Sequence, residues 1–97
     1  MAARKLFHYK GRQHPLVVEM IVWALTVPTS DRPHGLKYRL YCGRDGECIV
    51  RYDNERGKGD HCHRASDELP YEFESLEKLI ADFKHDCAHL AGWKWEK

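Results

Sequence analysis

Residues 16–27 read LVVEMIVWALTV, and this run limits what a chain of 97 residues can fold into more than any other segment. It is almost continuously apolar and rich in β-branched and aromatic residues, which favour strands. As a helix it would present apolar side chains on nearly every side, which a domain this small cannot cover. We therefore predict a long central strand, whose only charge, Glu19, shares a face with Ile21, Trp23 and Leu25.

Three further segments have the composition of strands. Residues 4–10, RKLFHYK, predict a short first strand that ends in a turn at 11–15. Residues 36–42 alternate between apolar and polar side chains, and residues 48–53 return antiparallel after the turn dipeptide Asp45-Gly46. The sequence thus predicts four strands that follow one another in an antiparallel sheet.

The last third of the chain changes its apolar period from two to that of a helix. We expect a loop over 54–70 and a brief extended piece at 71–73. Ser75 then provides an N-cap, and Gly92 provides a stop. The apolar side chains between them are spaced as on one face of a helix: Leu76, Leu79, Ile80, Phe83, Cys87 and Leu90. The predicted fold class is α+β, a four-stranded antiparallel β-meander with one C-terminal α-helix packed on one face, in a single small domain over residues 1–97.

The net charge of +1 conceals an asymmetry along the chain. Residues 1–64 hold 12 Lys and Arg against 7 Asp and Glu (12 − 7 = +5), whereas residues 65–97 hold 4 against 8 (4 − 8 = −4). This polarity predicts that the strands face a polyanion and the helix does not. A mixed, solvated surface is the alternative.

Composition also indicates the compartment and the absence of cofactors. No window approaches 18 consecutive apolar residues, and the N-terminus has no cleavage site of a signal peptide, so we expect a cytoplasmic protein with no membrane contact. The four cysteines should then be free thiols. Their spacings match no zinc pattern, although Cys62 lies between two histidines. We predict no metal and no cofactor.

The densest chemistry lies in residues 52–63, YDNERGKGDHCH. Gly57 and Gly59 flank Lys58, so the backbone can turn sharply and present N–H groups beside an ammonium, as in an anion nest. Arg56 and Lys58 are candidate phosphate ligands.

The two histidines of this segment are candidates for proton transfer. His61 and His63 lie two residues apart and share a side if the chain is extended there. Two imidazoles suit the acid and base roles in the attack of a 2′-hydroxyl on phosphorus. Asp60 or Asp53 would orient one of them, and Asn54 would contact a base edge or cap a turn. The alternative is a surface loop in which carboxylates simply pair with cations.

The same segment carries a resemblance to a known family. YDNERGKGDHCH, followed by LPYEF and a helix that opens with SLEKLIADF, resembles the TumE toxin components of bacterial type II toxin–antitoxin systems. HGLKYRLYC and the apolar strand upstream fit as well, so the similarity spans about residues 15–86. The resemblance implies a toxin that is neutralised by a helix-turn-helix antitoxin. Cys62 departs from the basic or polar residue we expect at that position.

We weigh three hypotheses. In the first, the chain is a metal-independent endoribonuclease toxin with an RNA substrate, by analogy with other small toxins. His61 and His63 share acid and base roles, Asp53 or Asp60 orients them, and the remaining polar residues bind substrate: Arg56, Lys58, Asn54, Lys37, Arg39 and Arg51. The second is a non-catalytic module that binds nucleic acid or protein. The third is a metal-dependent nuclease that uses Asp53, Glu55, Asp60 and a histidine.

Both ends of the chain carry candidate binding residues. The basic first strand would line an RNA path, and its edge would pair with a second copy in a homodimer or with a partner protein. Trp93 and Trp95 would anchor the antitoxin or pack on the chain's own core.

Overall fold

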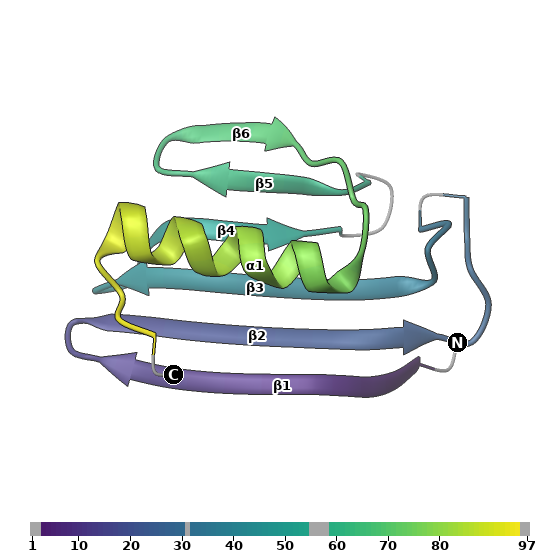
Figure 1. The fold of residues 1–97 in the computed structure, drawn as a ribbon, viewed down its shortest axis with the longest axis horizontal. Helices are drawn as coiled ribbons and strands as arrows, with labels where there is room; N and C mark the ends of the chain where they lie inside the picture. Colours follow the sequence, from purple (N-terminus) through teal and green to yellow (C-terminus); the bar gives the residue numbers. More distant parts are fainter. Residues whose placement is uncertain (1–2, 31, 55–58, 96–97) are drawn as a thin grey trace.

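A computed structural model describes residues 3–30, 32–54 and 59–95 of the protein. The chain forms one antiparallel sheet in which neighbouring strands follow sequence order, with a helix across one face (Figure 1). The α+β class and the C-terminal helix are confirmed, but the sheet has six strands rather than the four predicted. Its strands are β1 (Ala3–Gln13), β2 (Leu16–Leu25), β3 (Leu36–Arg44), β4 (Glu47–Asp53), β5 (His61–Arg64) and β6 (Asp67–Pro70).

The two unpredicted strands lie inside the segment 54–70 that we expected to be a loop. β5 and β6 form a hairpin whose turn places Ala65 at a positive φ of 53°. Their residues have little intrinsic preference for strands, so the hairpin depends on the pairing of β5 with β4. Pro70 is tolerated because β6 is an edge strand. The extended piece predicted at 71–73 is not a strand.

The central strand divides its side chains between two faces, and Glu19 lies on the same face as Ile21 and Trp23, as predicted. Val18, Met20 and Val22 are almost completely buried beneath the helix, whereas Glu19 and Trp23 point to the other face. The core therefore lies between the sheet and the helix. Its other members come from all parts of the chain: Leu16, Tyr38, Leu40, Cys42, Val50, Tyr52, Cys62, Leu79, Phe83, Cys87, Ala91 and Trp93.

The helix begins and ends where the sequence predicted. α1 (Leu76–Asp86) is capped by Ser75, whose hydroxyl accepts the Lys78 N–H at 3.1 Å. It continues into a π-helical turn, η1 (Cys87–Ala91), which Gly92 ends in the left-handed conformation at φ 79°.

The C-terminal tail packs on the chain's own core. Trp93 is 3% exposed and lies over Gly11 of β1, where a Cβ atom would approach its ring to 3.1 Å. Trp95 donates its indole N–H to the Lys84 carbonyl at 2.9 Å. The tail thus covers part of β1 on the helix side, so Trp93 is a core residue rather than an exposed anchor.

Three tyrosine hydroxyls donate to carboxylates beneath or beside the helix. Tyr71 bonds Asp82 at 2.7 Å, and Tyr52 bonds Asp86, which also accepts from the Arg64 guanidinium at 2.7 Å. Tyr38 bonds Asp60 at 2.7 Å. Burial, followed by these carboxylate partners, raises the pKa of all three tyrosines.

We expect the protein to lose stability steeply above pH 10. The unfolded tyrosines lose their protons near pH 10, whereas Tyr38, Tyr52 and Tyr71 keep them in the fold, so the native state binds more protons. The free energy of unfolding should then fall by up to about 4 kcal/mol per pH unit from these three groups. Urea unfolding measured between pH 8 and 11 tests this. Tyr71→Phe should reduce the slope, and equal slopes in both proteins would contradict the assignment.

Candidate functional site

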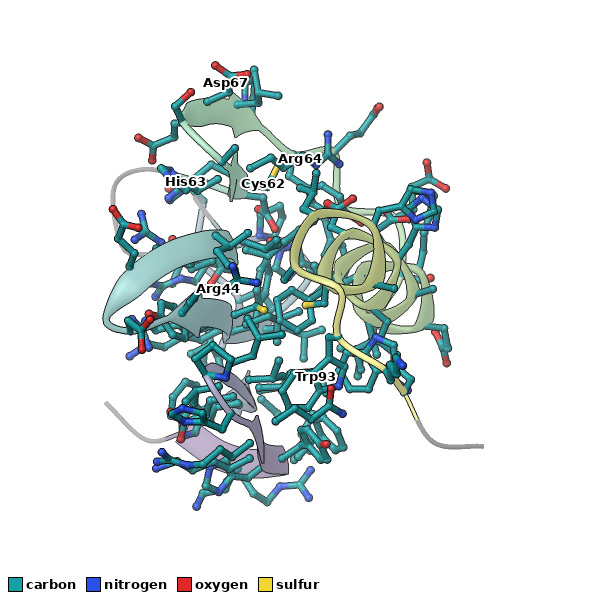
Figure 2. The ribbon with its side chains drawn as sticks, turned by 90° about the vertical axis from the view of Figure 1, so that its left-hand side faces the viewer. Arg44, Cys62, His63, Arg64, Asp67 and Trp93 are labelled. Carbon is teal, nitrogen blue, oxygen red and sulfur yellow. The ribbon has the colours of Figure 1, made fainter. Side chains whose placement is uncertain are left out.

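The face of the sheet away from the helix carries the chemistry predicted from the sequence. Residues paired across antiparallel strands point to the same side, so the strand register defines this open face. Its members on the central and later strands are Glu19, Ile21, Trp23, Lys37, Arg39, Tyr41, Arg51, Asp53, His61, His63 and Glu68, and β1 adds Lys5, His8, Lys10 and Arg12. Figure 2 shows His63 on this side, with Cys62 and Arg64 on the helix side.

A carboxylate, an imidazole and a guanidinium meet on the open face. Asp53 Oδ1 lies 2.8 Å from His61 Nε2, and its Oδ2 lies 3.0 Å from Arg51 Nε. Asp53 and His61 are only 9% and 8% exposed. Despite these distances the groups are poorly aligned, so Arg51 Nε and Asp53 Oδ1 have no aligned hydrogen-bond partner within the described part of the chain. Both atoms are shielded from solvent, so their missing partners are a feature of the buried pair rather than an opening for a ligand.

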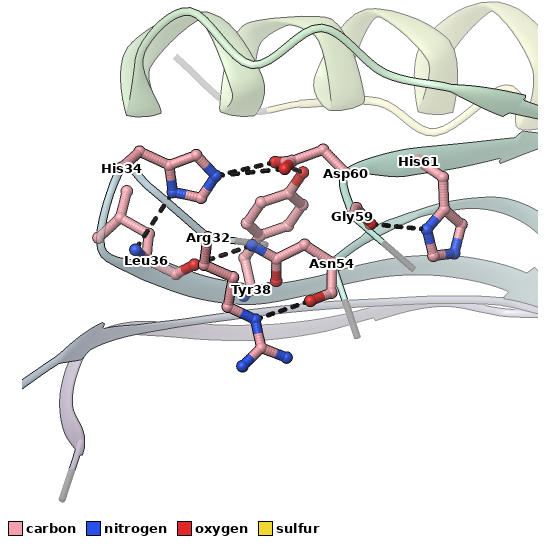
Figure 3. A network of polar contacts seen from close by, with 8 residues as sticks. All are labelled: Arg32, His34, Leu36, Tyr38, Asn54, Gly59, Asp60 and His61. Carbon is pink, nitrogen blue, oxygen red and sulfur yellow. Dashed lines mark hydrogen bonds and ion pairs between the residues drawn. The ribbon is translucent and has the colours of Figure 1, made fainter. Parts of the chain in front are cut away.

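The surroundings of His61 assign different roles to its two ring nitrogens. Nδ1 lies 3.1 Å from the Gly59 carbonyl, which can only accept, so Nδ1 carries a proton (Figure 3). Nε2 faces two carboxylates, Asp53 at 2.8 Å and Glu68 at 3.4 Å. Asp53 and Glu68 thus lie against the nitrogen that remains for proton exchange, so His61 and Asp53 would exchange a proton as a pair.

His63 follows two residues later on the same strand. It pairs with Arg51 on one side and with Glu68 on the other, about 7 Å along the strand from His61. Cys62, between the histidines, is 2% exposed and belongs to the core, where burial raises the pKa of its thiol. The structure therefore places both imidazoles on one face and the cysteine on the other.

Asp60 does not join this cluster. Its carboxylate accepts the Tyr38 hydroxyl at 2.7 Å and lies 3.0 Å from His34 Nε2, pointing away from the His61 ring (Figure 3). His34 in turn accepts the Leu36 N–H through Nδ1. Asp53, rather than Asp60, is the carboxylate beside His61.

Asn54 is occupied by the backbone of β3. It is completely buried; its Oδ1 accepts the Tyr38 N–H at 3.0 Å and its Nδ2 donates to the Leu36 carbonyl at 2.8 Å. The side chain thus prolongs the β3–β4 pairing beyond Asp53. Its backbone carbonyl accepts the Arg32 guanidinium at 2.9 Å. This role is structural, and neither amide group is left for a base edge.

The basic residues predicted to bind substrate are divided between the open face and the undescribed segment. The Lys37 ammonium lies 5.1 Å from the centre of the Trp23 ring, and the Arg39 guanidinium lies 5.4 Å from that of Tyr41. Arg56 and Lys58 fall outside the described residues. Sequence reasoning did not assign Trp23, Tyr41 and Glu68 to the site; the alternation of β2 and β3 was the available signal for the first two.

The carboxylates of the metal-dependent hypothesis do not converge where they are described. Asp53 faces His61, and Asp60 faces His34 and Tyr38. Glu55 lies outside the described residues. Within residues 3–30, 32–54 and 59–95, no group of three or more His, Cys, Asp or Glu side chains has the arrangement of a metal site.

The fold and its open face define a class: a small α+β domain with a helix on one side of its sheet and a basic surface with imidazoles on the other. A family model described as Toxin TumE matches residues 4–91. The chain therefore belongs to the TumE toxin family, which confirms the resemblance seen in the sequence and implies an antitoxin partner. No curated protein and no solved structure gave a match. None of the helices in the described ranges has the length and apolarity to cross a bilayer.

Proposed function

We propose that this toxin is a metal-independent endoribonuclease. The observation that carries the proposal is the 2.8 Å contact between His61 Nε2 and Asp53 Oδ1 on the open face, with His63 on the same side. An imidazole in contact with a buried carboxylate forms a pair that can exchange a proton with a substrate hydroxyl.

In the proposed reaction, the His61–Asp53 pair removes the proton from a ribose 2′-hydroxyl. The 2′-oxygen attacks the adjacent phosphorus, the bond from phosphorus to the 5′-oxygen breaks, and His63 protonates that leaving oxygen. The products are a 2′,3′-cyclic phosphate and a 5′-hydroxyl. Arg51 and Arg39 stabilise the charge that develops on the phosphoryl oxygens, which is typically worth about 3–4 kcal/mol for one well-placed donor.

The charge distribution supports a polyanionic substrate. The open face defined above carries six Lys and Arg side chains against three carboxylates, Glu19, Asp53 and Glu68. On α1, by contrast, Glu77, Asp82 and Asp86 outnumber Lys78 and Lys84. The phosphate backbone would thus be drawn to the side of the molecule that holds the imidazoles.

Incubation of purified protein with total RNA, with and without chelator, tests the proposed function. We expect cleavage that is equal in both samples, and cyclic phosphate ends. Intact RNA after long incubation would refute the activity, and cleavage abolished by chelator would transfer support to the metal-dependent hypothesis.

The pairing of cations with aromatic rings favours a second candidate, a non-catalytic nucleic-acid-binding module. Lys37 with Trp23 and Arg39 with Tyr41 are suited to hold phosphates and bases without cutting them. This candidate predicts binding that weakens steeply with salt and no product on a gel.

We further propose that the antitoxin is a helix-turn-helix protein and that the pair acts in the cytoplasm. The adjacent gene should encode such a protein, which should copurify with the toxin and relieve growth arrest. If the adjacent gene encodes a protein of another class that copurifies with the toxin and relieves growth arrest, the helix-turn-helix assignment is overturned.

We also propose that β1 mediates a homodimer. β1 is an 11-residue edge strand, and Leu6 and Phe7 remain 42% and 37% exposed. Light scattering should show a dimer that Leu6→Lys disrupts; a monomer at high micromolar concentration would exclude this interface.

A further inference from the structure

A hollow of about 270 Å³ adjoins the imidazole cluster on the open face. Trp23, Lys37, Tyr38, Arg39 and Asp53 line it. We propose that this hollow is a nucleobase subsite and that the substrate class is single-stranded RNA. This assignment rests on the proposed function, because the proposed cleavage by His61 and His63 is the reason to expect an RNA base beside them.

The hollow exists because β4 ends before β2 and β3 do. The β3–β4 pairing begins at Arg39↔Asp53, whereas the β2–β3 pairing continues outward to Trp23↔Lys37 and Ala24↔Leu36. Beyond Asp53, the buried side chain of Asn54 bonds the β3 backbone, so strand pairing does not continue over this part of the face. Within residues 3–30, 32–54 and 59–95, the rings and charges of β2 and β3 are therefore left open beside the end of β4.

The lining has the chemistry that recognises a base. Trp23 is partly buried and supplies an aromatic surface for stacking, with the Lys37 ammonium 5.1 Å from its ring centre. The Asp53 carboxylate is part of the lining, its side chain is 12% exposed, and it can accept a base N–H. Arg39 is exposed and can donate to a base oxygen or to the adjacent phosphate.

The register connects this hollow to the reacting groups. Arg39, Asp53 and His61 occupy one row across β3, β4 and β5, and neighbouring strands lie about 4.8 Å apart. A base in the hollow would thus bring its own ribose and phosphate within reach of His61. A base paired and stacked in a duplex cannot enter, so the subsite selects unpaired RNA.

A single-stranded DNA oligonucleotide with one 2-aminopurine tests the subsite without cleavage, since it lacks the 2′-hydroxyl nucleophile. Binding should quench the aminopurine fluorescence through stacking on Trp23. Trp23→Ala should weaken binding about 10- to 100-fold and remove the quench, whereas Trp23→Tyr should retain most of both. Trp95→Phe, on the helix side, is the matched control. Circular dichroism checks each fold, and Lys37→Ala, at an exposed position, gives a second variant that should weaken binding.

The outcomes separate the subsite from the proposed cleavage. Quenching that depends on Trp23, with no cleavage of total RNA, supports the subsite and refutes the nuclease. Cleavage with unchanged kcat/KM in Trp23→Ala, or binding of duplex as tight as single strand, overturns the subsite. If Trp23→Ala fails to fold, the other two variants decide. The subsite is then overturned when Trp23→Tyr and Lys37→Ala bind and quench as the wild type does and duplex competes as well as single strand.

Discussion

His61→Ala should lower the rate of RNA cleavage at least about 100-fold while the protein remains folded. The His61 imidazole contacts Asp53 at 2.8 Å, and its removal takes away the partner with which Asp53 would accept the 2′-hydroxyl proton. Initial rates on a labelled RNA measure the loss. His89→Ala, which changes an exposed histidine beyond α1, should cut at the wild-type rate. A folded, fully active His61→Ala protein would remove this residue from the mechanism.

The role of His63 can be separated from that of His61 with a modified substrate. Replacing the leaving 5′-oxygen by sulfur gives a group that departs without protonation. His63→Ala should be nearly inactive on ordinary RNA and recover on the sulfur substrate, whereas His61→Ala should remain inactive on both. The opposite pattern would exchange the acid and base assignments, and recovery of neither variant would place His63 outside proton transfer.

Phe83→Ala should lower the free energy of unfolding by about 3–5 kcal/mol. Phe83 is completely buried at the centre of α1 and packs edge-on against Tyr52, with ring centres 6.0 Å apart. Its removal leaves a cavity where the helix meets the sheet. Because small domains are stable by only about 5–15 kcal/mol, the variant should be partly unfolded at 37 °C.

Urea unfolding followed by circular dichroism measures this loss, with Leu90→Ala as the control. Leu90 is 47% exposed, so its truncation should change stability by less than about 0.5 kcal/mol. A loss below 1 kcal/mol for Phe83→Ala would show that the helix does not depend on this contact.

Local periodicity was sufficient to predict the long elements. The β-branched and aromatic composition of 16–27 predicted β2, Glu19 marked one of its faces, and the spacing of Leu79 and Phe83 predicted the buried side of α1. Such patterns are readable because each side chain's direction follows from the backbone repeat alone. For the same reason, the sequence placed His61 and His63 on a common side as soon as that segment was taken as extended.

The short hairpin was not readable in this way. HCHR in β5 and DELP in β6 have no strand composition, and each is only four residues long. They form strands because β4 offers β5 an unpaired edge, which is a non-local interaction. The position of His61 beside Asp53 depends on that pairing. The sequence could therefore suggest the residues of the site but not the contacts between them.

The order of residues along the chain thus determined which elements form and which side chains share a face, because both follow from the backbone period. Only the tertiary structure decided between the two candidate carboxylates. Asp60 is drawn away by the hydroxyl of Tyr38, 22 positions earlier, while Asp53 meets His61 across two paired strands. Contacts between residues distant in sequence depend on how the strands are packed, and no local pattern records that.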